Sequence, residues 1–160
     1  MTASNGINSA EMRAHEGDDS FSSPAVILVE PQLGENIGTT ARAMLNFGLT
    51  DLRLVRPRIG WENDNSVAAA SGAKRVLKEA HLFETTEAAI ANLQNVYAST
   101  GRSRDMIQRV LSPRGAAQAM RRDALCGASS GVLFGPQRSG LTNEDLSLAD
   151  AVITVPANST

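Results

Sequence analysis

The sequence has 160 residues, 42% of them hydrophobic, a formal net charge of −2 and one cysteine, Cys126. This length suits one domain with a buried core, and a single cysteine excludes an intrachain disulfide. No apolar segment opens the chain and no run approaches the ~18 apolar residues of a membrane span, so we expect a cytoplasmic protein without a membrane partner.

Charge is spread unevenly along the chain. Residues 1–23 hold four acids and one arginine and are rich in Ser, Asn, Asp and Gly, a composition that predicts a disordered tail. Residues 24–160, which we expect to form the domain, hold 14 basic and 13 acidic residues. The domain as a whole is therefore not basic, and any affinity for nucleic acid has to come from local clusters.

The most informative stretch begins with an apolar run within residues 26–30, which is typical of a buried strand. Pro31 ends this run, and a helix is predicted over residues 36–47 with Asn36 as its N-cap. Gly48 follows at the left-handed position that often ends a helix. The outward face of the predicted helix is polar and carries Glu35, Thr39, Arg42 and Asn46.

Further strands and helices alternate along the chain. Apolar runs predict strands at residues 52–55, 81–83, 96–99, 131–135 and 151–155. Helices are predicted at residues 66–72 with a break towards 79, at 86–93, at 112–125, and after a capping box of Thr142 with Asp145. This alternation indicates an α/β domain with a mainly parallel sheet flanked by helices. Ligands bind beyond the carboxyl ends of such strands, which points to the loops after residues 30, 99, 134 and 155.

Several common kinds of site have no support in the sequence. No Gly-x-Gly-x-x-Gly follows a strand, and no P-loop lysine motif occurs. The two histidines, His15 and His81, lie in no motif, and with one cysteine they do not suggest a zinc site. No Gly-x-Ser-x-Gly elbow supports a serine hydrolase. We therefore expect chemistry without a metal.

Arginine carries the strongest local signal. Arg42 lies on the outward helix face, where a guanidinium suits bidentate binding of a phosphate. Guanidinium stays protonated at neutral pH, which argues against a simple general base, although that role is left open. Residues 102–122 contain six arginines and one acid, Asp105, and form a local basic cluster suited to phosphates. Within it, Arg102 and Arg104 are the candidate RNA contacts.

Four stretches together resemble a known family. Residues 36–48, which read Asn36-Ile-Gly-Thr-Thr-Ala-Arg42-Ala-Met and end in Asn-Phe-Gly48, look like the first motif of the SpoU/TrmH RNA 2′-O-ribose methyltransferases of the SPOUT class. Residues 134–141 and 153–158 match further family motifs at the family's spacing. With residues 99–104, the pattern is most similar to the TrmJ-like tRNA branch, and the resemblance runs from about residue 24 to residue 160.

The resemblance implies transfer of a methyl group from S-adenosylmethionine to a ribose 2′-hydroxyl, with S-adenosylhomocysteine as the product. It implies tRNA, at an anticodon-loop nucleotide, or rRNA as the partner, together with a homodimer and a SPOUT fold with a C-terminal trefoil knot. The implied catalytic residues are Arg42 and Asn36. The implied cofactor-binding residues are Ser99, Thr100, Gly101, Gly135, Gln137, Gly140, Leu141, Ile153, Pro156 and Asn158. The implied RNA-binding residues are Arg42, Arg102 and Arg104.

The sequence departs from the family pattern at two places. Members usually carry Glu where this chain has Gln137; an amide still donates and accepts hydrogen bonds, so we expect the cofactor pocket to tolerate it, but it cannot supply a negative charge. The chain stops at Thr160, where a Ser-Leu-Asn run of the third motif should begin. We therefore expect an incomplete knot segment and a sequence that is a fragment of a longer protein.

Two other functions remain open at this point. The first is a catalytically silent RNA-binding module, which Gln137 and the missing part of the third motif would favour. The second is a small-molecule α/β enzyme that uses the same strand-end cleft, against which the arginines of residues 102–122 argue mildly. RNA binding without cofactor binding would favour the module, and competition by RNA for the cleft would exclude the small-molecule enzyme.

Overall fold

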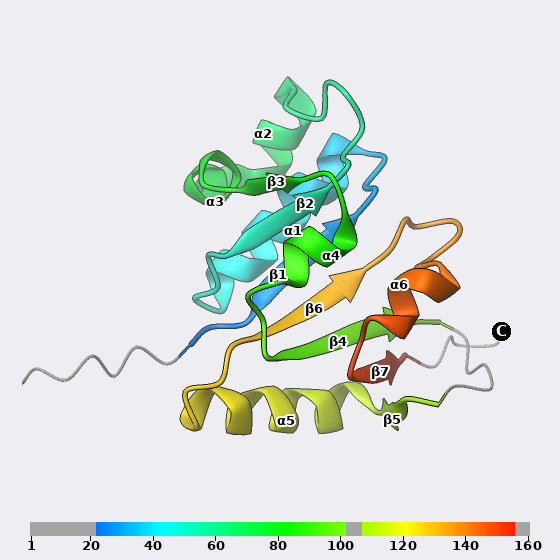
Figure 1. The fold of residues 1–160 in the computed structure, drawn as a ribbon. Helices are drawn as coiled ribbons and strands as arrows, with labels where there is room; N and C mark the ends of the chain where they lie inside the picture. The colour runs from blue at the N-terminus through cyan, green and yellow to red at the C-terminus, as the bar shows by residue number, and fades with distance from the viewer. Residues whose placement is uncertain (1–21, 102–106, 156–160) are drawn as a thin grey trace, which may run out of the picture.

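The computed structural model describes residues 22–101 and 107–155. Within these residues, seven strands form one sheet in the order β3-β2-β1-β6-β4-β7-β5, and every neighbouring pair is parallel. Helices flank the sheet on both faces (Figure 1). The predicted α/β fold with a mainly parallel sheet is confirmed. Most of the predicted tail of residues 1–23, namely residues 1–21, and the chain end at 156–160 lie outside the described residues.

The described elements follow the predicted alternation. The strands are β1 (Ala25–Val29), β2 (Leu52–Val55), β3 (His81–Phe83), β4 (Asn95–Thr100), β5 (Arg109–Leu111), β6 (Ser130–Phe134) and β7 (Ala151–Thr154). The helices are α1 (Gly34–Asn46), α2 (Asp64–Ala70), α3 (Lys74–Lys78), α4 (Thr86–Ile90), α5 (Pro113–Leu125) and α6 (Asn143–Ser147), with a 3-10 turn, η2 (Ser71–Ala73), between α2 and α3. Strand β5 was not predicted, because it is short and mostly exposed and so has no apolar pattern.

The alternating side chains of the strands build a core on each face of the sheet. On one face, Val26 and Leu28 pack with residues of α1, α2 and α3, and Tyr97 packs with residues of α5. On the other face, Ile27 and Val29 pack with residues of α4 and α6. The sheet is thus covered on both sides, which explains why its central strands read as continuous apolar runs.

Helix α1 begins earlier than predicted. Its N-cap is Leu33, which makes no side-chain capping bond, so the prediction that Asn36 is the N-cap is wrong. The reason is a close tertiary contact: a side chain at Gly34 would meet the backbone carbonyl oxygen of Trp61 at 2.6 Å. The chain can therefore turn into the helix at Gly34, which leaves the side chain of Asn36 free for another contact. The predicted helix end is confirmed, since Gly48 has φ +73.

Gly38, inside the motif that resembles the methyltransferase family, has a packing role. A Cβ atom there would overlap the carbonyl oxygen of Ser66 and lie 2.9 Å from the Cβ of Ala69. Ser66 belongs to the capping box that opens α2, in which the side chain of Asn63 accepts from the Ser66 amide. The glycine thus lets α1 approach α2 closely and holds the outward face of α1 in place.

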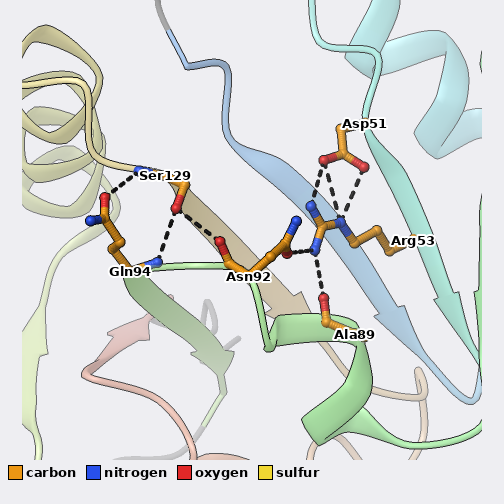
Figure 2. Close-up of polar contacts among 6 residues, drawn as sticks. All are labelled: Asp51, Arg53, Ala89, Asn92, Gln94 and Ser129. Carbon is orange, nitrogen blue, oxygen red and sulfur yellow. Dashed lines mark hydrogen bonds and ion pairs between the residues drawn. The ribbon is translucent and has the colours of Figure 1, made fainter.

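A buried arginine ties the amino-terminal edge of the sheet together (Figure 2). Arg53, 7% exposed, donates through Nε and Nη2 to the carboxylate of Asp51 and through Nη1 to the carbonyl of Ala89 at 2.7 Å and to Oδ1 of Asn92 at 2.6 Å. The carbonyl of Asn92 in turn accepts from the hydroxyl of Ser129 at 3.1 Å. The network connects β2, the end of α4 and the start of β6, at the edge opposite to the predicted ligand loops.

The one tyrosine of the chain gives a test of the packing of α5. Tyr97 donates its hydroxyl to Oδ2 of Asp123 at 2.7 Å; its burial, and then this bond, raise the pKa of Tyr97 from 10.0 to about 12. The unfolded chain releases this proton from about pH 10 while the folded chain keeps it, so the tyrosine should lower the free energy of unfolding as the pH rises from 10 to 12. Tyr97→Phe should remove this contribution and cost about 1 kcal/mol at neutral pH for the lost hydrogen bond.

Urea unfolding at several alkaline pH values, with tyrosinate absorbance of the folded chain, would check this expectation. The unaltered protein and Tyr97→Phe should converge in stability as the pH rises above 10. Tyrosinate absorbance that appears in the folded chain near pH 10 would contradict it.

Candidate functional site

Strands β1 and β6 are neighbours in the sheet, with Ile27 paired to Leu133, and their carboxyl ends open into one cleft. The cleft has a volume of about 770 Å³ and lies between the loop that follows β1 and the loop that joins β6 to α6. The two loops are far apart in the sequence but lie side by side where the arrows of β1 and β6 end (Figure 1). The cleft is therefore at the sheet edge where the sequence predicted a ligand site.

One hydrogen bond crosses this cleft between two predicted site residues. The side-chain amide of Asn36 donates from Nδ2 to Oε1 of Gln137 at 3.1 Å. On α1, the hydroxyls of Thr39 and Thr40 donate to the backbone carbonyl of Asn36 at 3.1 and 2.7 Å. Because Nδ2 is engaged with Gln137, Oδ1 of Asn36 is presented as an acceptor of a ligand's hydrogen bond.

The loop that carries Gln137 has a shape that glycine permits. A Cβ atom at Gly135 would overlap the backbone of Gly140 and Leu141, so the two ends of the loop touch directly. The amide of Gly140 donates to the carbonyl of Pro136 at 2.8 Å, and Gly140 has φ +67, a value that glycine adopts without strain. Leu141 is buried in the core under α6 and anchors the loop. Gly135, Gly140 and Leu141 therefore shape the rim of the cleft.

The remaining predicted cofactor residues gather at the ends of β4 and β7. Ser99 pairs with Ile153 and Thr100 with Thr154 in the sheet, and Gly101 follows at an exposed position with open space around it. Because β6 lies between β1 and β4, the loop after β6 has the Asn36 cleft on one side and the end of β4 on the other. Four predicted site residues lie outside the described residues: Arg102, Arg104, Pro156 and Asn158.

Arg42 lies on the exposed face of α1, as predicted. Its side chain makes no hydrogen bond or ion pair with any residue that the structure describes. It does not line the cleft itself but lies one turn beyond Thr39, which does. The structure thus joins Asn36 to Gln137 directly, while Arg42 on the same helix has no side-chain partner among the described residues.

Three arginines near the cleft were not singled out from the sequence as site residues. Arg56 ion-pairs with Glu30 at 3.0 Å and donates to the carbonyl of Glu84 at 2.8 Å, so its guanidinium is already bound. Arg58 and Arg138 line the cleft and have no hydrogen bond or ion pair through their side chains within the described part of the chain. Only the order of the strands, which no local pattern encodes, brings these two loops together.

Two negative findings concern the described residues. In residues 22–101 and 107–155, no group of three or more His, Cys, Asp and Glu side chains is arranged to hold a metal ion. No helix in the same ranges is long and apolar enough to cross a membrane.

The pattern of the SpoU rRNA Methylase family matches residues 23–160 of this chain. The tRNA (cytidine/uridine-2′-O-)-methyltransferase TrmJ of Yersinia pestis (strain Pestoides F) is 35% identical over 133 residues, which cover 83% of this chain and 51% of the relative. This chain therefore spans about half the length of that curated relative.

Solved structures agree in fold. TrmJ from Z. mobilis ZM4 is 53% identical with a TM-score of 0.79, over 84% of this chain and 59% of that one. A probable methyltransferase from Bordetella pertussis Tohama I is 34% identical with a TM-score of 0.79, over 89% of this chain and 86% of that one. The sheet and its flanking helices are thus shared with known methyltransferase folds.

Proposed function

Because this chain belongs to the SpoU rRNA methylase family, we propose that it transfers a methyl group from S-adenosylmethionine to a ribose 2′-hydroxyl of tRNA. The observation that carries the proposal is the cleft beside β1 and β6, in which Asn36 is held by Gln137. The choice of tRNA over rRNA follows the 35% identity to a tRNA (cytidine/uridine-2′-O-)-methyltransferase. The resemblance of the sequence motifs to the TrmJ-like branch makes an anticodon-loop nucleotide the more specific proposal.

The cofactor belongs, in this proposal, at the ends of β4, β6 and β7. The residues there fit such a group, because Ser99 and Thr100 are small and half-buried, and Gly101 leaves backbone open to a ligand. The touching ends of the β6–α6 loop at Gly135 and Gly140 close this region on the side of the cleft. Bound S-adenosylmethionine would supply an electrophilic methyl group on a sulfonium, so the transfer needs no metal. The reaction would leave S-adenosylhomocysteine and release the hydroxyl proton to solvent. The proposed cofactor-binding set is completed by Gln137, Leu141, Ile153, Pro156 and Asn158.

The cleft positions the substrate hydroxyl. Oδ1 of Asn36 accepts the hydrogen bond of a ribose hydroxyl, and the bond to Gln137 fixes which way the amide points. Arg42 binds the neighbouring phosphate in a bidentate contact, for which an unpaired guanidinium is suited. Holding the hydroxyl in line with the methyl group accounts for much of the rate gain in such a reaction. The high effective molarity of well-aligned groups can lower the activation barrier by about 7 kcal/mol.

Gln137 replaces the acid that the family usually carries, yet its role in this arrangement is retained. Oε1 of the amide accepts from Asn36 as a carboxylate oxygen would, so the orientation of Asn36 does not require a negative charge. The proposal also includes a homodimer in the cytoplasm, with residues 24–160 as the methyltransferase domain and residues 1–23 as its tail; the family match that begins at residue 23 supports this boundary.

Mass spectrometry of nucleosides from unmodified tRNA, incubated with the chain and S-adenosylmethionine, tests the function. We expect a 2′-O-methylated pyrimidine, made by the unaltered chain and by Gln137→Glu alike. If Gln137 silences the site, only the Gln137→Glu variant will give the product, and the unaltered chain is an RNA-binding module. A methylated base in place of a methylated ribose would contradict the assignment of the 2′-hydroxyl.

A further inference from the structure

Two arginines that have no side-chain partner among the described residues lie on opposite loops of the cleft that Asn36 lines, here called the Asn36 cleft. Arg58 is in the loop after β2, and Arg138 is in the loop between β6 and α6. Both side chains are exposed, and neither makes a hydrogen bond or ion pair with a residue that the structure describes. By contrast, Arg56, two residues before Arg58, is bound on both sides, by Glu30 and by the carbonyl of Glu84. The cleft therefore keeps two guanidinium groups available for a ligand.

The charge of the cleft lining favours an anion. Among the described residues of this lining, Glu30 is the one acid, and its carboxylate already faces Arg56 at 3.0 Å. Arg58 and Arg138 have no acidic partner there, so the described lining is positive although the chain has a formal net charge of −2. Positive charge concentrated in a concave surface attracts polyanions more strongly than the same charge on an open face.

The cleft also continues into a second depression. Arg58 and Gln32 line both the cleft and a neighbouring depression of about 290 Å³. The lining of this depression is mostly polar and includes Glu35, Asn63 and Asn65. A nucleic acid strand that leaves the cleft past Arg58 thus meets a polar surface that can form hydrogen bonds with sugar hydroxyls or base edges.

We propose that Arg58 and Arg138 bind the two backbone phosphates that flank the target nucleotide of a single-stranded RNA segment. This inference rests on the proposed function, because it takes the Asn36 cleft as the place of the target ribose. The volume of about 770 Å³ leaves room for one unstacked nucleotide between the two arginines. Arg58 and Arg138 are positioning residues: they fix the register of the strand while Asn36 faces the hydroxyl.

The test measures how the binding of unmodified tRNA to the full chain depends on salt concentration. The logarithm of the affinity falls as the logarithm of the salt concentration rises. Each lost phosphate contact on a single strand should make this slope shallower by about 0.7. We therefore expect Arg58→Gln and Arg138→Gln each to reduce the slope by about 0.7, and the double variant by about 1.4. Arg75→Gln, an exposed arginine on α3 outside the cleft lining, is the matched control and should leave the slope unchanged.

Lysine variants separate the contribution of the positive charge from that of the bidentate geometry of the guanidinium. Arg58→Lys and Arg138→Lys should keep the slope but bind more weakly, because lysine is a point charge without the bidentate fork. Slopes that stay unchanged in both glutamine variants, or that fall equally in Arg75→Gln, would overturn the arginine pair.

The two proposals fail separately. Normal slopes in the glutamine variants together with a 2′-O-methylated product would overturn the arginine pair and keep the function. Reduced slopes in the glutamine variants without any methylated product would keep the arginine pair and overturn the proposed function. No binding of tRNA by the unaltered chain would overturn both.

Discussion

Replacing Arg42 by alanine is expected to lower the rate of methyl transfer to tRNA about 10²-fold, because a misplaced substrate costs a rate of that order. The side chain is exposed and has no partner among the described residues, so its loss should change the free energy of unfolding by about 0.5 kcal/mol or less. Binding of S-adenosylmethionine should also be unchanged, since the proposed cofactor loops lie beyond β6. Single-turnover rates, calorimetric cofactor binding and thermal unfolding would measure the three quantities.

A matched pair of variants sharpens this test. Arg42→Lys keeps the charge but not the bidentate fork, and we expect it to recover only part of the lost rate. Arg75→Ala removes another exposed arginine, on α3, and should leave the rate unaltered. A normal rate in Arg42→Ala would remove this residue from the catalytic set and leave Asn36 as its remaining member.

Much of the fold could be predicted because its signals are local. The apolar run of β1 and the capping box of Thr142 with Asp145 are each encoded within a few residues, and both are present in the structure. Helix α5 was predicted at residues 112–125 and begins at Pro113, with Ser112 as its N-cap. The start of α1 was missed because it depends on Trp61, which approaches Gly34 from 27 positions further along the sequence.

The site could be predicted only in part, because it is made of long-range neighbours. Asn36 and Gln137 are 101 residues apart, and no spacing rule indicates that β1 lies next to β6. The family resemblance supplied both residues as separate members of a set, without the hydrogen bond that joins them. The resemblance assigned no role to Arg58 or to Arg138, although Arg138 lies within the matched residues 134–141. Only the packed loops reveal that the two arginines line one cleft.

Arg53 illustrates the same limit for stability. In the sequence it interrupts the apolar strand at residues 52–55, and arginine is among the residues that are rarely buried without a partner. The structure instead buries it, because Asp51, the carbonyl of Ala89 and the side chain of Asn92 together satisfy its donors (Figure 2). A buried guanidinium is tolerated when its hydrogen-bond partners are in place. Removing one member of such a buried pair leaves an uncompensated charge and lowers the stability of the fold.

Arg53→Met should therefore destabilise the protein by about 3 kcal/mol, at the lower end for a broken buried pair, because Asp51 is 33% exposed and regains water. A loss of this size should lower Tm by roughly 10 °C.

Arg56→Met is the matched control: it breaks an ion pair whose side chains are 42% and 47% exposed, and should cost about 1 kcal/mol or less. Methyl transfer below the unfolding transition should be normal in Arg53→Met, since the network lies at the edge of the sheet opposite to the cleft. Equal Tm losses in the two variants would contradict the special cost of the buried arginine.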